Sequence, residues 1–233
     1  MGRISKITTI CALLALGGLG AADAPKAQTA DTAVETTVAV TSDGFTVSEI
    51  SDEIFARIDG KSYPKGCPVP LSDLRYITVL HYDLDGNVVE GEMICNKSIA
   101  NDLIEIFQAL YDAKYPIERM RLIDEYDAND EASMTDNNTS CFCYRTIAGS
   151  TKISNHGLGL AVDINPLYNP YEKIRNDGSS FVQPEAGRPY TDRKKDFPMK
   201  IDRNDLCLKE FAKHGFTWGG DFTSIKDYQH FEK

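Results

Sequence analysis

The chain has 233 residues, of which 42% are hydrophobic and 26% are charged, and its formal net charge at pH 7 is -10. This composition is ordinary for a soluble globular protein, and the length allows one domain with a sizeable core or at most two small ones. Proteins that bind nucleic acid usually present a basic face. This acidic sequence has no basic cluster, so we expect no nucleic acid partner.

Residues 1–22 have the pattern of a signal peptide. Arg3 and Lys6 precede an uncharged run of apolar and small residues at 7–22 (ITTICALLALGGLGAA). A basic segment followed by such a run is typical of secretory signals, and the run is short for a transmembrane span. We therefore predict export, with no stable membrane span after cleavage. The alternatives are a retained N-terminal anchor and lipid attachment at Cys11.

Residues 23–40 are rich in Ala, Thr and Asp and contain few large apolar side chains, which predicts a flexible tether. The folded body is then expected at 41–233. Of the six cysteines, five lie in this body, and an odd count leaves at least one thiol unpaired in a monomer. Cys141 and Cys143 are close enough in sequence to form a ligand pair, but the favoured interpretation is one buried free thiol and at most one disulfide partner, with the pairing left open.

The first half of the body predicts a hairpin followed by a helix. Two β-rich segments, 76–84 and 88–95, flank the turn sequence Asp85-Gly86-Asn87, which is a hairpin pattern. Apolar residues at helical spacing over 98–111 then predict a helix.

The second half predicts shorter elements in irregular order. We expect a strand at 120–123, a polar loop at 127–140 and a long connection at 166–200 that is dense in Pro, Gly, Asn and Asp. A helix is expected at 204–214, with Gly215 as its C-terminal stop. Strands and helices in this mixed order favour the α+β class with an antiparallel sheet.

The segment 154–165 (SNHGLGLAVDIN) places a histidine, two glycines and a carboxylate in an apolar strand pattern. Because alternate residues of a strand face opposite sides, Asp163 should lie on the face away from the apolar set. A buried carboxylate is costly unless it is compensated, and a metal ion would compensate it. We expect Gly157 and Gly159 to loosen the backbone so that His156 turns toward Asp163.

His156 and Asp163 are residue types that bind zinc, and a catalytic zinc site has three protein ligands and one water. His230 is the best candidate for the third ligand among the four histidines, because Asp227 precedes it by three residues. A carboxylate that close to a ligand can act as a general base or orient the ligand. Two histidines and one carboxylate also form iron sites, so these residue types alone leave the metal open.

Four sequence elements in order resemble zinc peptidases that act on bacterial cell-wall peptides. The pattern Ser-x-His-x-x-Gly-x-Ala-x-Asp at 154–163 is similar to their first motif, and Asp-x-x-His at 227–230 to their second. Arg145 corresponds to an upstream arginine that assists the substrate, and 215–221 (GFTWGGD) looks like the VanY-type and endolysin branch. The family contains the VanY and VanX types of D-alanyl-D-alanine carboxypeptidase and dipeptidase and the related phage L-alanyl-D-glutamate endolysins. The resemblance covers about 140–233.

The resemblance implies a Zn²⁺ ion held by His156, Asp163 and His230, with Asp227 as the general acid and base. It also implies that Arg145 steadies the developing oxyanion or holds a substrate carboxylate. The base is Asp here rather than the Glu of the VanX pattern, and the shorter side chain must sit closer to the water.

Two further residues are candidates for substrate binding. Ser154 is expected either to contact the substrate or to shape its turn. Trp218 is expected either to line the substrate cleft or to pack in the core.

The fold implied by the resemblance is a small antiparallel sheet flanked by helices, shared by D-Ala-D-Ala peptidases and the Hedgehog signalling domain. The implied protein is bacterial and either periplasmic or in the cell envelope. Its expected activity is zinc-dependent hydrolysis of peptidoglycan stem peptides or their precursor, with D-alanyl-D-alanine carboxypeptidase first and L-alanyl-D-glutamate endopeptidase as the alternative. The alternative from another class is a non-catalytic zinc-containing binding domain. The segment 166–200 is expected to choose the substrate.

Overall fold

The computed structural model describes residues 39–147 and 149–233. The predicted signal peptide at 1–22 and most of the predicted tether at 23–40 lie outside these residues. The last two tether positions, 39 and 40, belong to the first strand. Within the described ranges, no helix combines the length and the apolar character that a membrane crossing requires.

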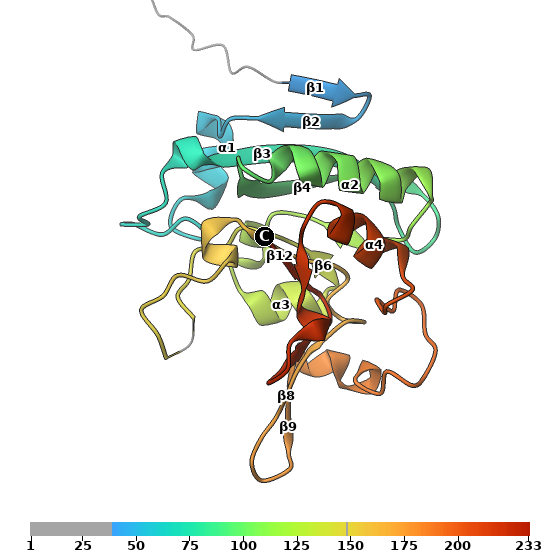
Figure 1. Cartoon of the computed structure of the whole chain (residues 1–233). Helices are drawn as coiled ribbons and strands as arrows, with labels where there is room; N and C mark the ends of the chain where they lie inside the picture. The colour runs from blue at the N-terminus through green and yellow to red at the C-terminus, as the bar shows by residue number, and fades with distance from the viewer. Residues whose placement is uncertain (1–38, 148) are drawn as a thin grey trace, which may run out of the picture. The chain divides into compact units, whose positions relative to one another are not determined.

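A four-stranded antiparallel sheet occupies the N-terminal part of the described chain (Figure 1). Its strands, in both spatial and chain order, are β1 (Ala39–Ser42), β2 (Phe45–Ser48), β3 (Leu74–Tyr82) and β4 (Val88–Asn96). The predicted hairpin is confirmed as β3 and β4, which pair without a break from Leu74 opposite Asn96 to Tyr82 opposite Val88. The Asp83 carboxylate accepts the backbone N–H groups of Asp85 and Asn87 and so closes the turn.

The predicted helix at 98–111 is confirmed as α2 (Ala100–Asp112), which packs against β2 and β3. The apolar positions that predicted it form its buried face, because residues three and four apart share one side of a helix. A shorter helix, α1 (Asp52–Ile58), precedes β3, and the Ser51 hydroxyl caps it by accepting the N–H of Ile54 at 3.2 Å.

The C-terminal part contains three small sheets. The first is antiparallel, with the order β10 (Thr217–Trp218), β12 (His230–Glu232) and β7 (Ala161–Asp163); the second, also antiparallel, runs β11 (Lys226–Asp227), β8 (Tyr171–Ile174) and β9 (Ser180–Gln183). The third pairs β5 (Arg119–Met120) with β6 (Asn138–Thr139) in parallel. The predicted α+β class is confirmed.

Two further helices and five 3-10 turns complete the described secondary structure. The helices are α3 (Asp130–Thr135) and α4 (Leu206–Lys213), and the 3-10 turns are Leu71–Asp73, Ile123–Tyr126, His156–Leu158, Glu185–Tyr190 and Gly219–Asp221. The predicted helix at 204–214 is confirmed as α4, with the Asp205 carboxylate capping its start. Gly215 follows with φ +81, the left-handed conformation that ends many helices.

Three predictions of local structure differ from the observed elements. The polar segment 127–140 is not a loop, since it contains α3 and β6. The connection 166–200 contains a hairpin formed by β8 and β9, which is labelled at the bottom of Figure 1. The strand predicted at 120–123 is reduced to β5, because a 3-10 turn begins at Ile123. These elements have two to six residues each, too few to show a hydrophobic period.

Aromatic packing connects α4 to β12. The Phe211 ring stacks on Phe231 of β12 with ring centroids 4.3 Å apart, and it meets Phe216 edge-on at 5.1 Å. Phe231 is fully buried in the main core, to which the apolar face of α2 also contributes. Its two neighbours on β12, His230 and Glu232, therefore point to the opposite face of the strand.

The five cysteines of the described chain are all free thiols. Cys67 is half-buried, and the other four are buried: Cys95, Cys141, Cys143 and Cys207. Burial raises the pKa of these four thiols, which favours the uncharged form. The cysteines therefore behave as small apolar side chains.

Candidate metal centre

A 3-10 turn carries His156 to the site. The Ser154 hydroxyl accepts the backbone N–H of Gly157 at 2.9 Å and stabilises the start of the turn. Gly159 ends the turn with φ +70. The His156 ring is fixed by its Nδ1, which lies 2.8 Å from the backbone carbonyl oxygen of Cys141. Since a carbonyl only accepts hydrogen bonds, Nδ1 carries the proton and Nε2 presents a lone pair to the site.

The two glycines of this turn have roles that differ from the predicted loosening of the backbone. A Cβ at Gly157 would lie 2.7 Å from the carbonyl oxygen of Arg145, and one at Gly159 would lie 2.7 Å from the backbone nitrogen of Asn96. Both positions therefore permit close contact with neighbouring backbone. The turn is tightly packed, and this packing holds His156 in place.

The antiparallel pairing of β7 with β12 brings the other two candidates together. In this register Asp163 lies opposite His230, and Val162 lies opposite Phe231. Directly opposed residues in an antiparallel pair project to the same face, so the carboxylate and the imidazole meet on one side. Val162 and Phe231 enter the core on the other side, as the predicted alternation requires.

The side chains of His156, Asp163 and His230 converge on one point and are all buried. His156 Nε2 lies 3.2 Å from Asp163 Oδ2, and His230 Nδ1 lies 3.2 Å from Asp163 Oδ1. The two ring nitrogens are 3.1 Å apart. One atom from each of the three residues lies within 4.8 Å of the others, so the group could bind a metal ion. Two imidazoles and a carboxylate are a donor set that suits zinc.

Glu232 fixes the outward side of the His230 ring. His230 Nε2 lies 3.0 Å from Glu232 Oε2, so the ring donates to a carboxylate there and turns Nδ1 toward Asp163. Ligating histidines usually bond their second nitrogen in this way. Sequence reasoning missed Glu232, although the period of two along β12 places it on the same face as His230.

The charges of these side chains are strongly coupled. Burial opposes the charged form of Asp163, but the two imidazoles hold the pKa of its carboxyl well below the usual range. Burial likewise opposes the charged form of His230, but hydrogen bonds to Asp163 and Glu232 raise the pKa of this imidazole to about 10. The centre therefore favours positive charge next to the Asp163 carboxylate, as a cation site does.

Asp227 lies next to the centre on β11 and is different from the other carboxylates. Its Oδ1 is buried and has no hydrogen-bond partner among the described residues. Burial raises the pKa of this carboxyl, the positive charge of His230 lowers it and the negative charge of Asp163 raises it, and together these effects place the pKa at about 7. An unpartnered buried oxygen with such a pKa suits a group that gains and loses a proton near neutral pH.

The segment before β11 is shaped to fit against this carboxylate. A Cβ at Gly219 would lie 2.5 Å from the Asp227 carbonyl oxygen and 3.1 Å from the His230 Cβ. Glycine at this position therefore lets the turn 219–221 pack directly on both residues.

The comparison with known families agrees with this geometry. Residues 148–233 match the model of the family described as D-alanyl-D-alanine carboxypeptidase. This part of the chain is similar to that family. The matched range contains the three candidate ligands and Asp227, and the predicted resemblance is confirmed. No curated protein and no solved structure matched the chain.

Arg145 lies just outside the range matched to the carboxypeptidase family. Its guanidinium forms an ion pair with the Asp130 carboxylate, with Nη2 and Oδ2 3.0 Å apart, and its side chain is 34% exposed. Burial raises the pKa of the Asp130 carboxyl. The charges of Arg145 and His156 lower this pKa and that of Asp163 raises it, so Arg145, His156 and Asp163 all lie near this carboxylate. Sequence reasoning missed Asp130, because it lies in the segment 127–140 that was predicted as a loop.

Ser154 and Trp218 have clear structural roles. The Ser154 hydroxyl bonds the turn at Gly157, as described above. The Trp218 indole is buried in the main core and donates its Nε1–H to the Tyr228 carbonyl oxygen at 2.9 Å. Substrate contacts of these two residues, and of Arg145, stay predictions.

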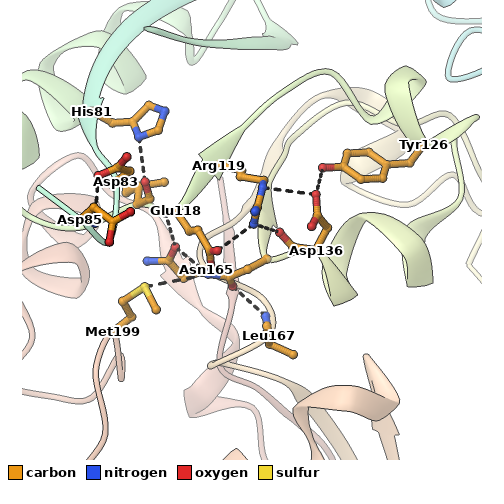
Figure 2. A network of polar contacts seen from close by, with 12 residues as sticks. His81, Asp83, Asp85, Glu118, Arg119, Tyr126, Asp136, Asn165, Leu167 and Met199 are labelled. Carbon is orange, nitrogen blue, oxygen red and sulfur yellow. Dashed lines mark hydrogen bonds and ion pairs between the residues drawn. The ribbon is translucent and has the colours of Figure 1, made fainter. Parts of the chain in front are cut away.

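Asn165 anchors the end of β7, two residues beyond Asp163 (Figure 2). Its Oδ1 accepts the backbone N–H of Glu118 at 3.2 Å, and its Nδ2 donates to the Pro116 carbonyl oxygen at 2.9 Å. Asn165 is buried and adopts φ 45, so the chain turns sharply here. These bonds fix the direction of the strand that carries Asp163.

We expect Gly159→Ala to lower the free energy of unfolding by more than Gly178→Ala does. Both glycines have left-handed φ values, +70 and +83, so each substitution should cost about 1–2 kcal/mol in backbone strain. Only the Gly159 Cβ would clash with backbone, at Asn96, whereas nothing lies within 4 Å of a Cβ at Gly178. The clash should add about 1–3 kcal/mol. Urea denaturation followed by Trp fluorescence measures the difference. Equal losses would show that the turn yields to the added methyl group.

Proposed function

We propose that this chain is an exported zinc metallopeptidase that hydrolyses peptidoglycan stem peptides, with D-alanyl-D-alanine carboxypeptidase activity. The observation that carries the proposal is the convergence of His156, Asp163 and His230 beside Asp227 in a segment of the carboxypeptidase family. Export to the periplasm or cell envelope is part of the proposal and rests on the signal-like sequence at 1–22.

The residues divide into a metal-binding set and a proton-transfer group. A zinc ion held by His156, Asp163 and His230 would act as a Lewis acid and make a bound water more acidic. Asp227 accepts the proton of the attacking water and delivers it to the amine that leaves. Its unpartnered oxygen and its pKa near 7 suit both transfers, because a general base works best when its pKa lies near the working pH.

Arg145 supplies positive charge at the edge of the centre. The Asp130 carboxylate holds one side of its guanidinium, which leaves other N–H donors for the substrate. These donors would bind either the developing oxyanion or the terminal carboxylate of a D-Ala-D-Ala peptide. The second role requires a free C-terminus, which a carboxypeptidase substrate has.

The hairpin of β8 and β9 is the best candidate for the element that chooses the substrate. β8 pairs with β11 so that Tyr171 lies opposite Asp227, and Gln229 Nε2 donates to the Gln183 carbonyl oxygen at 3.4 Å. The hairpin therefore stands beside the proposed base. An internal peptide would have to pass along it in the alternative activity, L-alanyl-D-glutamate endopeptidase.

A non-catalytic zinc-containing binding domain is the alternative from another class. The state of Asp227 argues against it, because a binding domain gains nothing from a buried carboxylate oxygen without a partner. The proposal of an enzyme therefore depends on Asp227 more than on the metal ligands.

Mass spectrometry of the products separates the activities. We expect the zinc-loaded protein to remove one terminal alanine from a muramyl pentapeptide ending in D-Ala-D-Ala. An internal cut that releases the stem peptide would support the endopeptidase instead. Turnover of neither substrate by a protein with one zinc per chain would contradict the peptidase proposal.

Asp227→Asn should keep zinc and lose activity, because the amide cannot take up a proton. We expect kcat to fall by about 10²–10⁴-fold, the usual contribution of a general base. His156→Ala should instead lose zinc, and Asp43→Asn, in the exposed turn between β1 and β2, is the matched control for loss of a carboxylate. Metal content and kcat are measured on the same preparations. Full activity in Asp227→Asn would assign the proton transfer to another group.

A further inference from the structure

Glu232 joins the two segments that carry the histidine ligands. Its Oε2 accepts one hydrogen bond from His230 Nε2 at 3.0 Å and another from Asn155 Nδ2 at 2.6 Å. Asn155 directly precedes His156, the first residue of the 3-10 turn. One carboxylate oxygen thus connects β12 to the turn that holds the other imidazole.

The two histidines are oriented by different kinds of acceptor. His156 Nδ1 bonds the backbone carbonyl of Cys141, which every residue type at that position would provide. His230 Nε2 bonds a side chain, so its orientation depends on the identity of residue 232. Glu232 is also partly buried, with 30% of its side chain exposed. Partial burial strengthens its electrostatic effect on the His230 ring.

We propose that Glu232 is a positioning residue for the metal ligand His230. Its carboxylate holds the proton on Nε2, so that the Nδ1 lone pair faces Asp163 and His156, and it makes Nδ1 a stronger electron donor. The amide of Asn155 holds the carboxylate in this position. The inference rests on the metal site of the proposed function but does not require peptidase activity.

Charge balance explains why a carboxylate suits this position better than a neutral acceptor. A zinc dication with two neutral imidazoles and the Asp163 carboxylate carries a net charge of +1 (+2 and -1). The Glu232 carboxylate brings this sum to zero within hydrogen-bond distance of a ligand. A buried centre with balanced charge costs less free energy than one with an unpaired charge.

Zinc affinity measured by competition with a chromogenic chelator tests this role. Glu232→Gln keeps the size and an acceptor oxygen but removes the charge, and Glu232→Ala removes both. We expect about 10-fold weaker zinc binding in Glu232→Gln and up to about 100-fold weaker binding in Glu232→Ala. Glu105→Gln, on the exposed side of α2 with 72% of its side chain accessible, is the control for loss of one negative charge.

Nitrogen NMR of the zinc-loaded proteins supplies a readout that a merely structural role would not change. In the wild-type protein the His230 Nε2–H should be observed and protected from exchange, and in Glu232→Ala it should exchange faster.

Glu232→Gln with the zinc affinity of Glu105→Gln would overturn the inference. Zinc binding without peptide hydrolysis would sink the proposed function and leave this inference standing. A wild-type chain that binds no zinc would overturn both.

Discussion

The pairing of β12 with β7 sets Asp163 directly opposite His230, and the candidate site depends on this register. The same pairing sets Val162 opposite Phe231, and both of these side chains are fully buried in the core. Because side chains alternate along a strand, a slip of one residue would move the ligands into the core and the apolar pair into the site. The burial of Phe231 against Phe211 therefore holds the candidate metal ligands in register as well as stabilising the fold.

The carboxylates around the centre have similar chemistry and different surroundings. Asp163 is held ionised between two imidazoles, Glu232 is held by His230 and Asn155, and Asp130 is paired with Arg145. Asp227 is buried with one oxygen that has no partner among the described residues, and its pKa is raised to about 7. Environment distinguishes these carboxylates, because positive partners favour the ionised form and burial without a partner opposes it.

Sequence reasoning predicted the long, regular elements and the residues that lie within motifs. The β3–β4 hairpin, α2 and α4 each show a turn sequence or a hydrophobic period. The two motifs pointed to His156, Asp163 and His230 as one group, and the structure places their side chains together. Sequence reasoning missed α3 and the β8–β9 hairpin, because α3 has six residues and each strand of the hairpin has four, which is too short for a period. It missed Asp130 and Glu232 for a different reason. Their roles arise from contacts with Arg145 and with His230 and Asn155, and no motif records such contacts.

X-ray absorption at the zinc edge, on protein loaded with one zinc per chain, tests the central claim most directly. The account predicts a first shell of nitrogen and oxygen only, at about 2.0–2.2 Å, from two imidazoles, one carboxylate and water. Cys141 and Cys143 are buried free thiols in the segment that precedes His156. They offer a competing set of sulfur ligands. A zinc–sulfur distance near about 2.3 Å would contradict the assignment of His156, Asp163 and His230.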